Sequence, residues 1–207
     1  MRKKVLLVAL TCFGLVAVVA STAPAKLTIY DFNLPDIDGK MVALTTFKGK
    51  VLLIVNVADG SNYTPQFAEL EKVYQTYKGQ GFVVLAFPSN DFGGEEPENE
   101  QQIKSFCEKN YHLTFPIFAK IPVRGDDATP LFRYLSKEAN PELKGAVHWN
   151  FTKFVIDRKG ALTARFEPPV SPDDPEVLVA IENALSGKKQ TSPSKDGKES
   201  KENRADR

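Results

Sequence analysis

The residues best suited to chemistry lie in a short polar loop, residues 59–62, whose sequence Asp-Gly-Ser-Asn follows an apolar run. An amphipathic segment begins directly after this loop. A nucleophile such as Ser61 is well placed there, because a helix N-terminus favours negative charge on the group in front of it. Few other groups offer comparable chemistry, since the chain has two cysteines, Cys12 and Cys107, and two histidines.

Two apolar runs frame this loop and must position it. Residues 51–57 and 82–87 are apolar on both faces, which is typical of central strands covered on both sides. Between them the spacing predicts a helix that ends near Lys78, with Thr64 as its N-cap and Pro65 as its first residue. The loop therefore joins the end of a buried strand to the start of a helix.

The remaining segments complete one domain over residues 26–186. We expect a hairpin near the N-terminus and a second helix capped by the pair Asn99 and Gln102. Further expected elements are a short strand at 115–118, a helix at 130–137, a hairpin spanning 151–166 and a last helix at 175–186. This order predicts an α/β fold with a mixed central sheet and helices on both of its faces.

The two ends of the chain differ from this domain. Residues 1–25 combine three basic residues, an apolar stretch and small residues before Ala25, a pattern typical of a cleaved export signal. The chain is therefore predicted to be exported to the periplasm or the exterior, and a retained N-terminal anchor is the alternative. Residues 187–207 are polar and predict a disordered tail.

The charge of the domain argues against one class of partner. The chain has 27 basic and 26 acidic residues, but residues 2–4 and the tail hold ten of the basic ones and four of the acidic ones. The 17 basic and 22 acidic residues that remain make the body mildly acidic. No nucleic-acid partner is expected for such a body.

Three segments together resemble the glutathione peroxidase family. They are residues 56–66 (NVADGSNYTPQ), 85–97 (LAFPSNDFGGEEP) and 149–158 (WNFTKFVIDR), and the likeness extends over residues 27–186. The resemblance implies a thioredoxin-like fold, thiol-dependent reduction of hydroperoxides, and glutathione or thioredoxin as reductant. It implies no cofactor and no metal, and the short segment from Leu135 to Trp149 favours a monomer.

The resemblance also identifies four site positions. Ser61 takes the position of the reactive cysteine or selenocysteine, Asp91 that of a supporting glutamine, and Trp149 and Asn150 match the family. A serine hydroxyl lacks the oxidation states through which a thiol cycles with peroxide. The sequence therefore favours a family member that has lost peroxidase catalysis and serves as a binding module.

An active thiol peroxidase that uses Cys107 is one alternative. Cys107 lies within the expected second helix, on the same apolar face as Ile103, so we expect it to be buried and inert. A resolving cysteine, which some relatives carry in this helix, would align with Glu108.

A cation site is another alternative. If the family fold brings Asp59, Ser61 and Asp91 together, with Glu95 or Glu96 nearby, their oxygens suit a hard cation such as calcium. A solvated acidic rim accounts for the same residues, and we expect that simpler arrangement.

A serine hydrolase built from Ser61, Asp91 and His148 is the last alternative. His148 directly precedes Trp149, so on a strand the two side chains point to opposite faces. If Trp149 lines the site, His148 does not reach the serine, and this function is disfavoured.

Overall fold

The computed structural model describes residues 27–188. The predicted export signal lies outside the described residues, as does the predicted tail apart from Gly187 and Lys188. None of the helices in the described part is long and apolar enough to span a membrane. The strands are β1 (Asn33–Pro35), β2 (Met41–Ala43), β3 (Val51–Val57), β4 (Phe82–Pro88), β5 (Lys153–Ile156) and β6 (Leu162–Phe166). The α-helices are α1 (Gln66–Tyr77), α2 (Glu100–Tyr111), α3 (Pro130–Lys137) and α4 (Pro175–Ser186), and short 3-10 turns cover Ile29–Asp31, Leu44–Phe47 and Lys78–Gln80.

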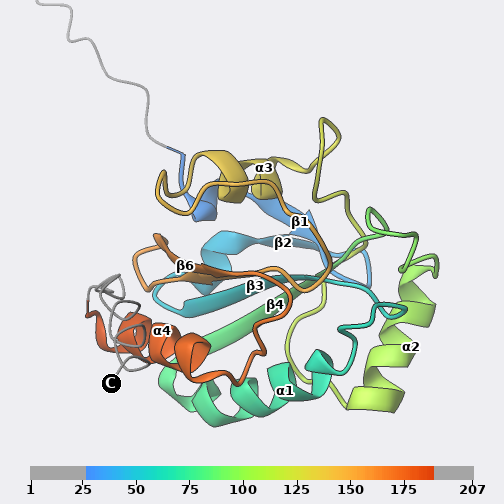
Figure 1. The fold of residues 1–207 in the computed structure, drawn as a ribbon, viewed down its shortest axis with the longest axis horizontal. Coiled ribbons are helices and arrows are strands. Elements are labelled where there is room, and N and C mark those ends of the chain that lie inside the picture. The colour runs from blue at the N-terminus through green and yellow to red at the C-terminus, as the bar shows by residue number, and fades with distance from the viewer. Residues whose placement is uncertain (1–26, 189–207) are drawn as a thin grey trace, which may run out of the picture.

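Four strands form the central sheet in the order β4-β3-β5-β6 (Figure 1). β3 pairs in parallel with β4 and antiparallel with β5, which in turn pairs antiparallel with β6. The sheet is therefore mixed, as the sequence predicted. All seven residues of β3 are buried, in agreement with a central strand that is apolar on both faces.

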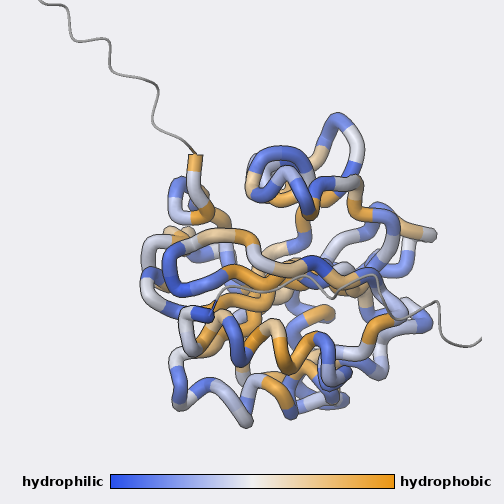
Figure 2. Tube along the Cα trace, turned by 60° about the vertical axis from the view of Figure 1, so that its left-hand side comes forward, coloured by the Kyte–Doolittle hydropathy of each residue, from blue (hydrophilic) through white to orange (hydrophobic). Residues whose placement is uncertain are grey.

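The two faces of the sheet carry separate apolar cores because side chains alternate along β3. Leu53 and Val55 pack with residues of α1, α2 and α4, whereas Leu52 and Ile54 pack with α3 and the N-terminal segment. Figure 1 shows α1 and α4 below the sheet and α3 above it. The most hydrophobic segments run through the middle of the molecule, and hydrophilic loops surround them (Figure 2). The prediction of helices on both faces is confirmed.

The two predicted hairpins are present with small changes. β1 and β2 form a separate two-stranded antiparallel sheet, and β5 and β6 flank the turn at 157–160. The second hairpin begins at Lys153 rather than at Phe151, because Phe151 has a left-handed backbone with φ of 66°. The predicted short strand start at 115–118 lies at the edge of the sheet beside β4, but it makes only isolated bridges, from Ile117 to Ala86 and from Phe118 to Asp36.

The predicted N-cap is present in α2 but not in α1. Asn99 caps α2, since its side chain accepts a hydrogen bond from the Gln102 amide at 3.0 Å. The predicted end of α1 near Lys78 is confirmed, but its predicted start is wrong, because the helix begins at Gln66 and Thr64 makes no capping bond to it. The Thr64 hydroxyl instead lies within hydrogen-bond distance of the carbonyls of Ala58, Asp59 and Ser61. Thr64 therefore folds the loop back on itself ahead of the helix.

Candidate functional site

Ser61 lies in the loop between β3 and α1, and only 6% of its surface is exposed. Its hydroxyl oxygen accepts a hydrogen bond from the Tyr63 amide at 3.3 Å. Its carbonyl accepts one from the Thr64 amide at 3.0 Å. The loop therefore holds the Ser61 side chain in a compact turn in front of the first helix.

Trp149 and Asn150 lie in the turn that precedes β5. The Trp149 carbonyl accepts hydrogen bonds from Asn56 Nδ2 and Thr152 Oγ1, both at 3.1 Å. The Trp149 ring packs against Phe92 with the ring centroids 5.7 Å apart, yet 38% of the residue is exposed. The backbone of Trp149 is therefore held in place, and part of its indole ring is available to a ligand.

Asn150 is fully buried and links this turn to the loop after β4. Its Nδ2 donates to Glu95 Oε2 at 2.8 Å, whereas its Oδ1 has no hydrogen-bond partner among the described residues. The Glu95 carbonyl in turn accepts a hydrogen bond from the Gly60 amide at 2.9 Å. A Cβ at Gly60 would lie 2.9 Å from that same oxygen, so only glycine allows the two loops to approach this closely.

Asp91 makes its contacts elsewhere. Its Oδ2 accepts hydrogen bonds from the backbone amides of Val123 at 2.6 Å and Arg124 at 3.1 Å. No hydrogen bond connects Asp91 with Ser61 in the described part of the chain. The carboxylate that contacts Asn150 is that of Glu95, so the loop after β4 presents a different residue to the site than the one the sequence identified.

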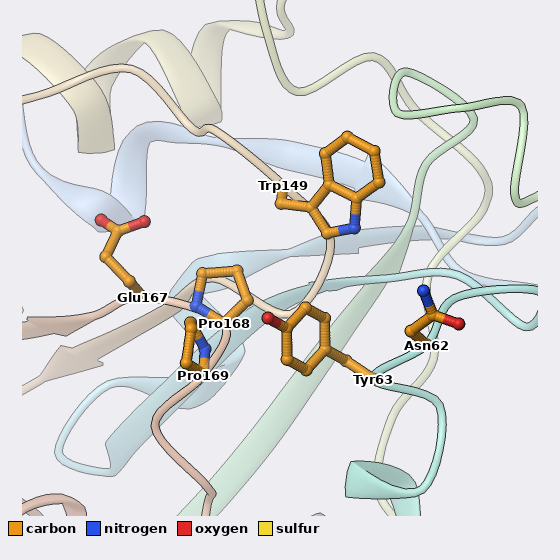
Figure 3. Close-up of a pocket in the computed structure, with 6 residues that line it drawn as sticks. All are labelled: Asn62, Tyr63, Trp149, Glu167, Pro168 and Pro169. Atoms are coloured by element: carbon orange, nitrogen blue, oxygen red, sulfur yellow. The ribbon is translucent and has the colours of Figure 1, made fainter.

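An open groove of about 440 Å³ lies beside the Ser61 loop (Figure 3). Trp149 forms one side, and Tyr63, Pro168 and Pro169 form the other. The polar side chains of Asn62 and Glu167 lie toward its two ends. Sequence analysis did not identify Tyr63 or the prolines as site residues. The adjacent pair at 168–169 was the one available signal, because such a pair makes a rigid turn with no amide hydrogens.

The comparisons with known proteins agree with this geometry. The family model described as glutathione peroxidase matches residues 29–136, more than half of the chain. The chain belongs to the glutathione peroxidase family. It is 44% identical over 150 residues to a glutathione peroxidase of Lactococcus lactis subsp. cremoris, covering 72% of this chain and 96% of the relative. The resemblance found in the sequence is thereby confirmed.

Solved structures support the same assignment. The crystal structure of T. cruzi GPX1 matches with a TM-score of 0.62 and 38% identity, covering 77% of this chain and 97% of that one. A thioredoxin family thiol:disulfide interchange protein from Chlorobium tepidum matches with a TM-score of 0.55 at 20% identity, over 74% of this chain and 92% of that one. The latter likeness shows the fold alone. The predicted thioredoxin-like α/β fold is confirmed.

Glutathione peroxidases reduce peroxides with a thiol or selenol, and Cys107 is the cysteine that the described residues contain. It is 1% exposed and packs in the core with Ile103 and Phe67. Burial, and then the nearby carboxylates of Glu96 and Asp59, raise the pKa of this thiol to about 12. Cys107 is therefore a neutral thiol in the core at physiological pH, as expected.

Asp59, a half-buried residue of the Ser61 loop, and the buried Glu96 form an acid pair. Glu96 is 1% exposed, its Oε2 accepts a hydrogen bond from the Asp59 amide at 3.0 Å, and its Oε1 has no partner among the described residues. Burial and the charge of Asp59 raise the pKa of Glu96 to about 8. Burial and then the charge of Glu98 raise the pKa of Asp59. The pair therefore holds a proton near neutral pH.

The two other predicted chemistries find no support in the described residues. No group of three or more acidic, histidine or cysteine side chains in residues 27–188 is arranged to hold a metal ion. His148 does not lie on a strand; it lines a second, smaller groove with Glu142, Lys144 and Arg165. In the described part of the chain no hydrogen bond joins His148 to Ser61 or Asp91, so the arrangement is not that of a serine hydrolase.

Proposed function

We propose that this glutathione peroxidase family protein is not a peroxidase and acts as an exported binding module, whose ligand occupies the groove beside Ser61. The observation that carries the proposal is the content of the β3–α1 loop. It presents a serine with 6% exposure, and the nearest candidate thiol is buried in the core. The family reaction needs a thiolate or selenolate that attacks the peroxide oxygen.

The polar surroundings of Ser61 also argue against thiol chemistry. Asp59 belongs to the loop itself, its amide donates to the Glu96 carboxyl group, and the side-chain amide of Asn150 donates to the Glu95 carboxylate. Negative charge at these positions disfavours a thiolate nearby. Changing the nucleophile alone is therefore only part of the departure from peroxidase chemistry.

The groove is what supports a binding role. Its apolar sides and polar ends match the usual pattern of a ligand site, and its volume is within the usual range. None of its six lining residues is basic, and Glu167 adds a carboxylate. The reductant glutathione carries two carboxylates, so it is a poor match for this surface. The groove favours an apolar ligand without carboxylates, about the size of a short peptide segment.

The deciding experiment is a coupled peroxide-consumption assay with glutathione and, separately, thioredoxin as reductant. All proteins carry Cys12→Ala, so that the cysteine of the predicted export signal does not contribute. We expect the parent protein to show no turnover above the protein-free blank, and Cys107→Ser to behave identically. Thiol-dependent turnover at rates usual for the family, lost in Cys107→Ser, would establish the alternative of an active peroxidase and overturn the proposal.

Ser61→Cys serves as the positive control in the same assay. The loop places this side chain in front of α1, where a thiol is partly activated by the helix N-terminus. We expect this variant to consume one equivalent of peroxide, with loss of one titratable thiol. The export part of the proposal is tested by fractionating cells and determining the N-terminal residue of the protein by mass spectrometry. Recovery of the intact chain in the cytoplasm would contradict export.

A further inference from the structure

Lys153 is a fully buried lysine at the first position of β5. It pairs with Val55 of β3 on one side and with Phe166 of β6 on the other. Lysine is almost never fully buried unless its ammonium has partners. No carboxylate in the described part of the chain comes within salt-bridge distance of Lys153. Its partners are backbone carbonyls.

The Lys153 ammonium connects the turn before β5 with the segment after β6. Nζ donates to the carbonyl of Phe151 at 2.8 Å and to the carbonyl of Pro168 at 3.4 Å. The Pro168 carbonyl also accepts a hydrogen bond from Gln66 Nε2 at 2.7 Å. One carbonyl oxygen thus connects β5, the segment after β6 and the first residue of α1.

These three segments are the walls of the groove. Trp149 lies two residues before Phe151, Tyr63 lies three residues before Gln66, and Pro168 itself lines the groove. Figure 3 shows Trp149 facing Pro168 and Tyr63 across it. The hydrogen bonds of Lys153 and Gln66 therefore lie behind the groove and tie its sides to one another.

The backbone at Phe151 makes this tie necessary. Phe151 has φ of 66°, a left-handed conformation that costs a non-glycine residue about 1–2 kcal/mol. Its amide donates to the Asn56 carbonyl at 2.6 Å, and its carbonyl accepts from Lys153. Both polar groups of the strained residue are thus held, and the position of Trp149 depends on that strained turn.

The charge of Lys153 is sensitive to pH near neutrality. Burial lowers the pKa of its ammonium to about 7, against the opposing influence of Glu69 on α1 and Glu167 in the segment after β6. The partner strands contribute Val55 and Phe166, which carry no charge. A hydrogen bond from a charged donor is about twice as strong as one from a neutral donor. Loss of the proton therefore weakens both bonds, of which the longer one, to the Pro168 carbonyl, connects the two sides of the groove.

We propose that Lys153 is the positioning residue of the groove: its ammonium holds the Trp149 side and the Pro168 side at a fixed spacing, and loss of its proton weakens this connection. The two sides of the groove are then held firmly at mildly acidic pH and less firmly at mildly alkaline pH. The consequence for binding rests on the proposed function, whereas the coupling between Lys153 and the groove is a property of the free protein.

The chain offers a built-in probe, since Trp149 is its single tryptophan. We would follow the emission and acrylamide quenching of Trp149 in the purified protein from about pH 5.5 to 9. The wild type is expected to show a red shift and greater quenching as pH rises, with a midpoint near pH 7. In Lys153→Met the emission and quenching of Trp149 are expected to stay at the alkaline wild-type values over the whole pH range. In Lys153→Arg, which stays charged, they are expected to stay at the acidic wild-type values.

Three matched variants separate the response of Lys153 from that of other ionisable side chains. His148→Gln, His112→Gln and Glu96→Gln are each expected to keep the wild-type transition. If Lys153→Met fails to fold by circular dichroism, the indole Nε1–H resonance of Trp149 in the wild type provides a second readout through its shift with pH. A transition that persists in Lys153→Met, one that vanishes in His148→Gln, or a wild-type protein with no transition would overturn the inference.

The outcome is independent of the peroxidase assay. Peroxidase turnover by the parent protein would end the proposed function and leave the pH response of Trp149 as predicted. A flat response would end the inference about Lys153 and leave the proposed function standing.

Discussion

The side chain of Asn150 donates a hydrogen bond to the carboxylate of Glu95 at 2.8 Å, and this contact joins the turn before β5 to the loop after β4. The Glu95 carbonyl receives the Gly60 amide, so the same residue also holds the loop that carries Ser61. The three segments that carry the family resemblance are thus connected to one another through Glu95. The integrity of the site depends on a buried amide and a carboxylate.

Asn150→Asp is the change that tests this connection. It replaces the donor with a second carboxylate facing Glu95, in a position with no exposure. We expect the free energy of unfolding to fall by about 2–4 kcal/mol at pH 7, because a buried hydrogen bond becomes a repulsion between like charges. Urea denaturation measures this, with Asn33→Asp at an exposed position of β1 as the control, expected to stay within about 0.5 kcal/mol. A loss below about 1 kcal/mol would contradict the connection.

Asp91 is predicted to act on the fold rather than on Ser61. Its carboxylate accepts the amides of Val123 and Arg124, so Asp91→Ala leaves two donors without partners. We expect a loss of about 1–3 kcal/mol in the free energy of unfolding and partial recovery in Asp91→Asn, which keeps an acceptor oxygen. The control is Asp127→Ala, at an exposed position of the loop that contains Val123 and Arg124, and it is expected to be neutral. Equal stability of Asp91→Ala and the wild type would argue against this role.

Much of the framework could be predicted from the sequence because it depends on local patterns. The apolar run of β3, the capping pair of α2 and the turn between β5 and β6 each follow from residues that are close in the chain. The start of α1 was misplaced because Thr64 bonds to carbonyls of its own loop, which compete with capping.

The site was only partly predictable, because its contacts connect distant segments. The partners of Asp91 lie in a loop about thirty residues further along the chain, so the position of Asp91 in the segment 85–97 gave no indication of them. Lys153 begins a strand whose pattern is equally compatible with an exposed lysine. Its burial depends on Pro168 and Gln66, which only the folded chain brings together.

Glu96 predicts a specific pH dependence of stability. Its pKa is about 8 in the folded protein and near 4.5 when unfolded, so between these values the folded state keeps a proton that the unfolded state has released. The stabilisation is complete below pH 4.5 and is lost as the pH rises through 8. Glu96→Gln is expected to remove this slope, and its gain in stability over the wild type is expected to grow from below about 1 kcal/mol at pH 5 to on the order of a few kcal/mol above pH 7.

Chemical denaturation at several pH values measures the effect of Glu96. The control is Glu142→Gln, an exposed residue outside the site, which should retain the wild-type slope. Lys153 acts in the opposite direction and in a higher window, since its lowered pKa makes stability rise between about pH 7 and 10.5. A Glu96→Gln profile parallel to that of the wild type below pH 7 would contradict the acid pair.

Cys107 is predicted to be chemically silent in the native protein. With a pKa of about 12, only about one thiol in ten thousand is ionised at pH 8, and the residue is 1% exposed. Labelling of native protein with a thiol-specific disulfide reagent should therefore give the same number of reactive thiols in the wild type and in Cys107→Ala. After unfolding in urea the wild type should react with one thiol more. Rapid labelling of Cys107 in the native state would show an accessible thiolate and would revive the alternative of a peroxidase that uses this residue.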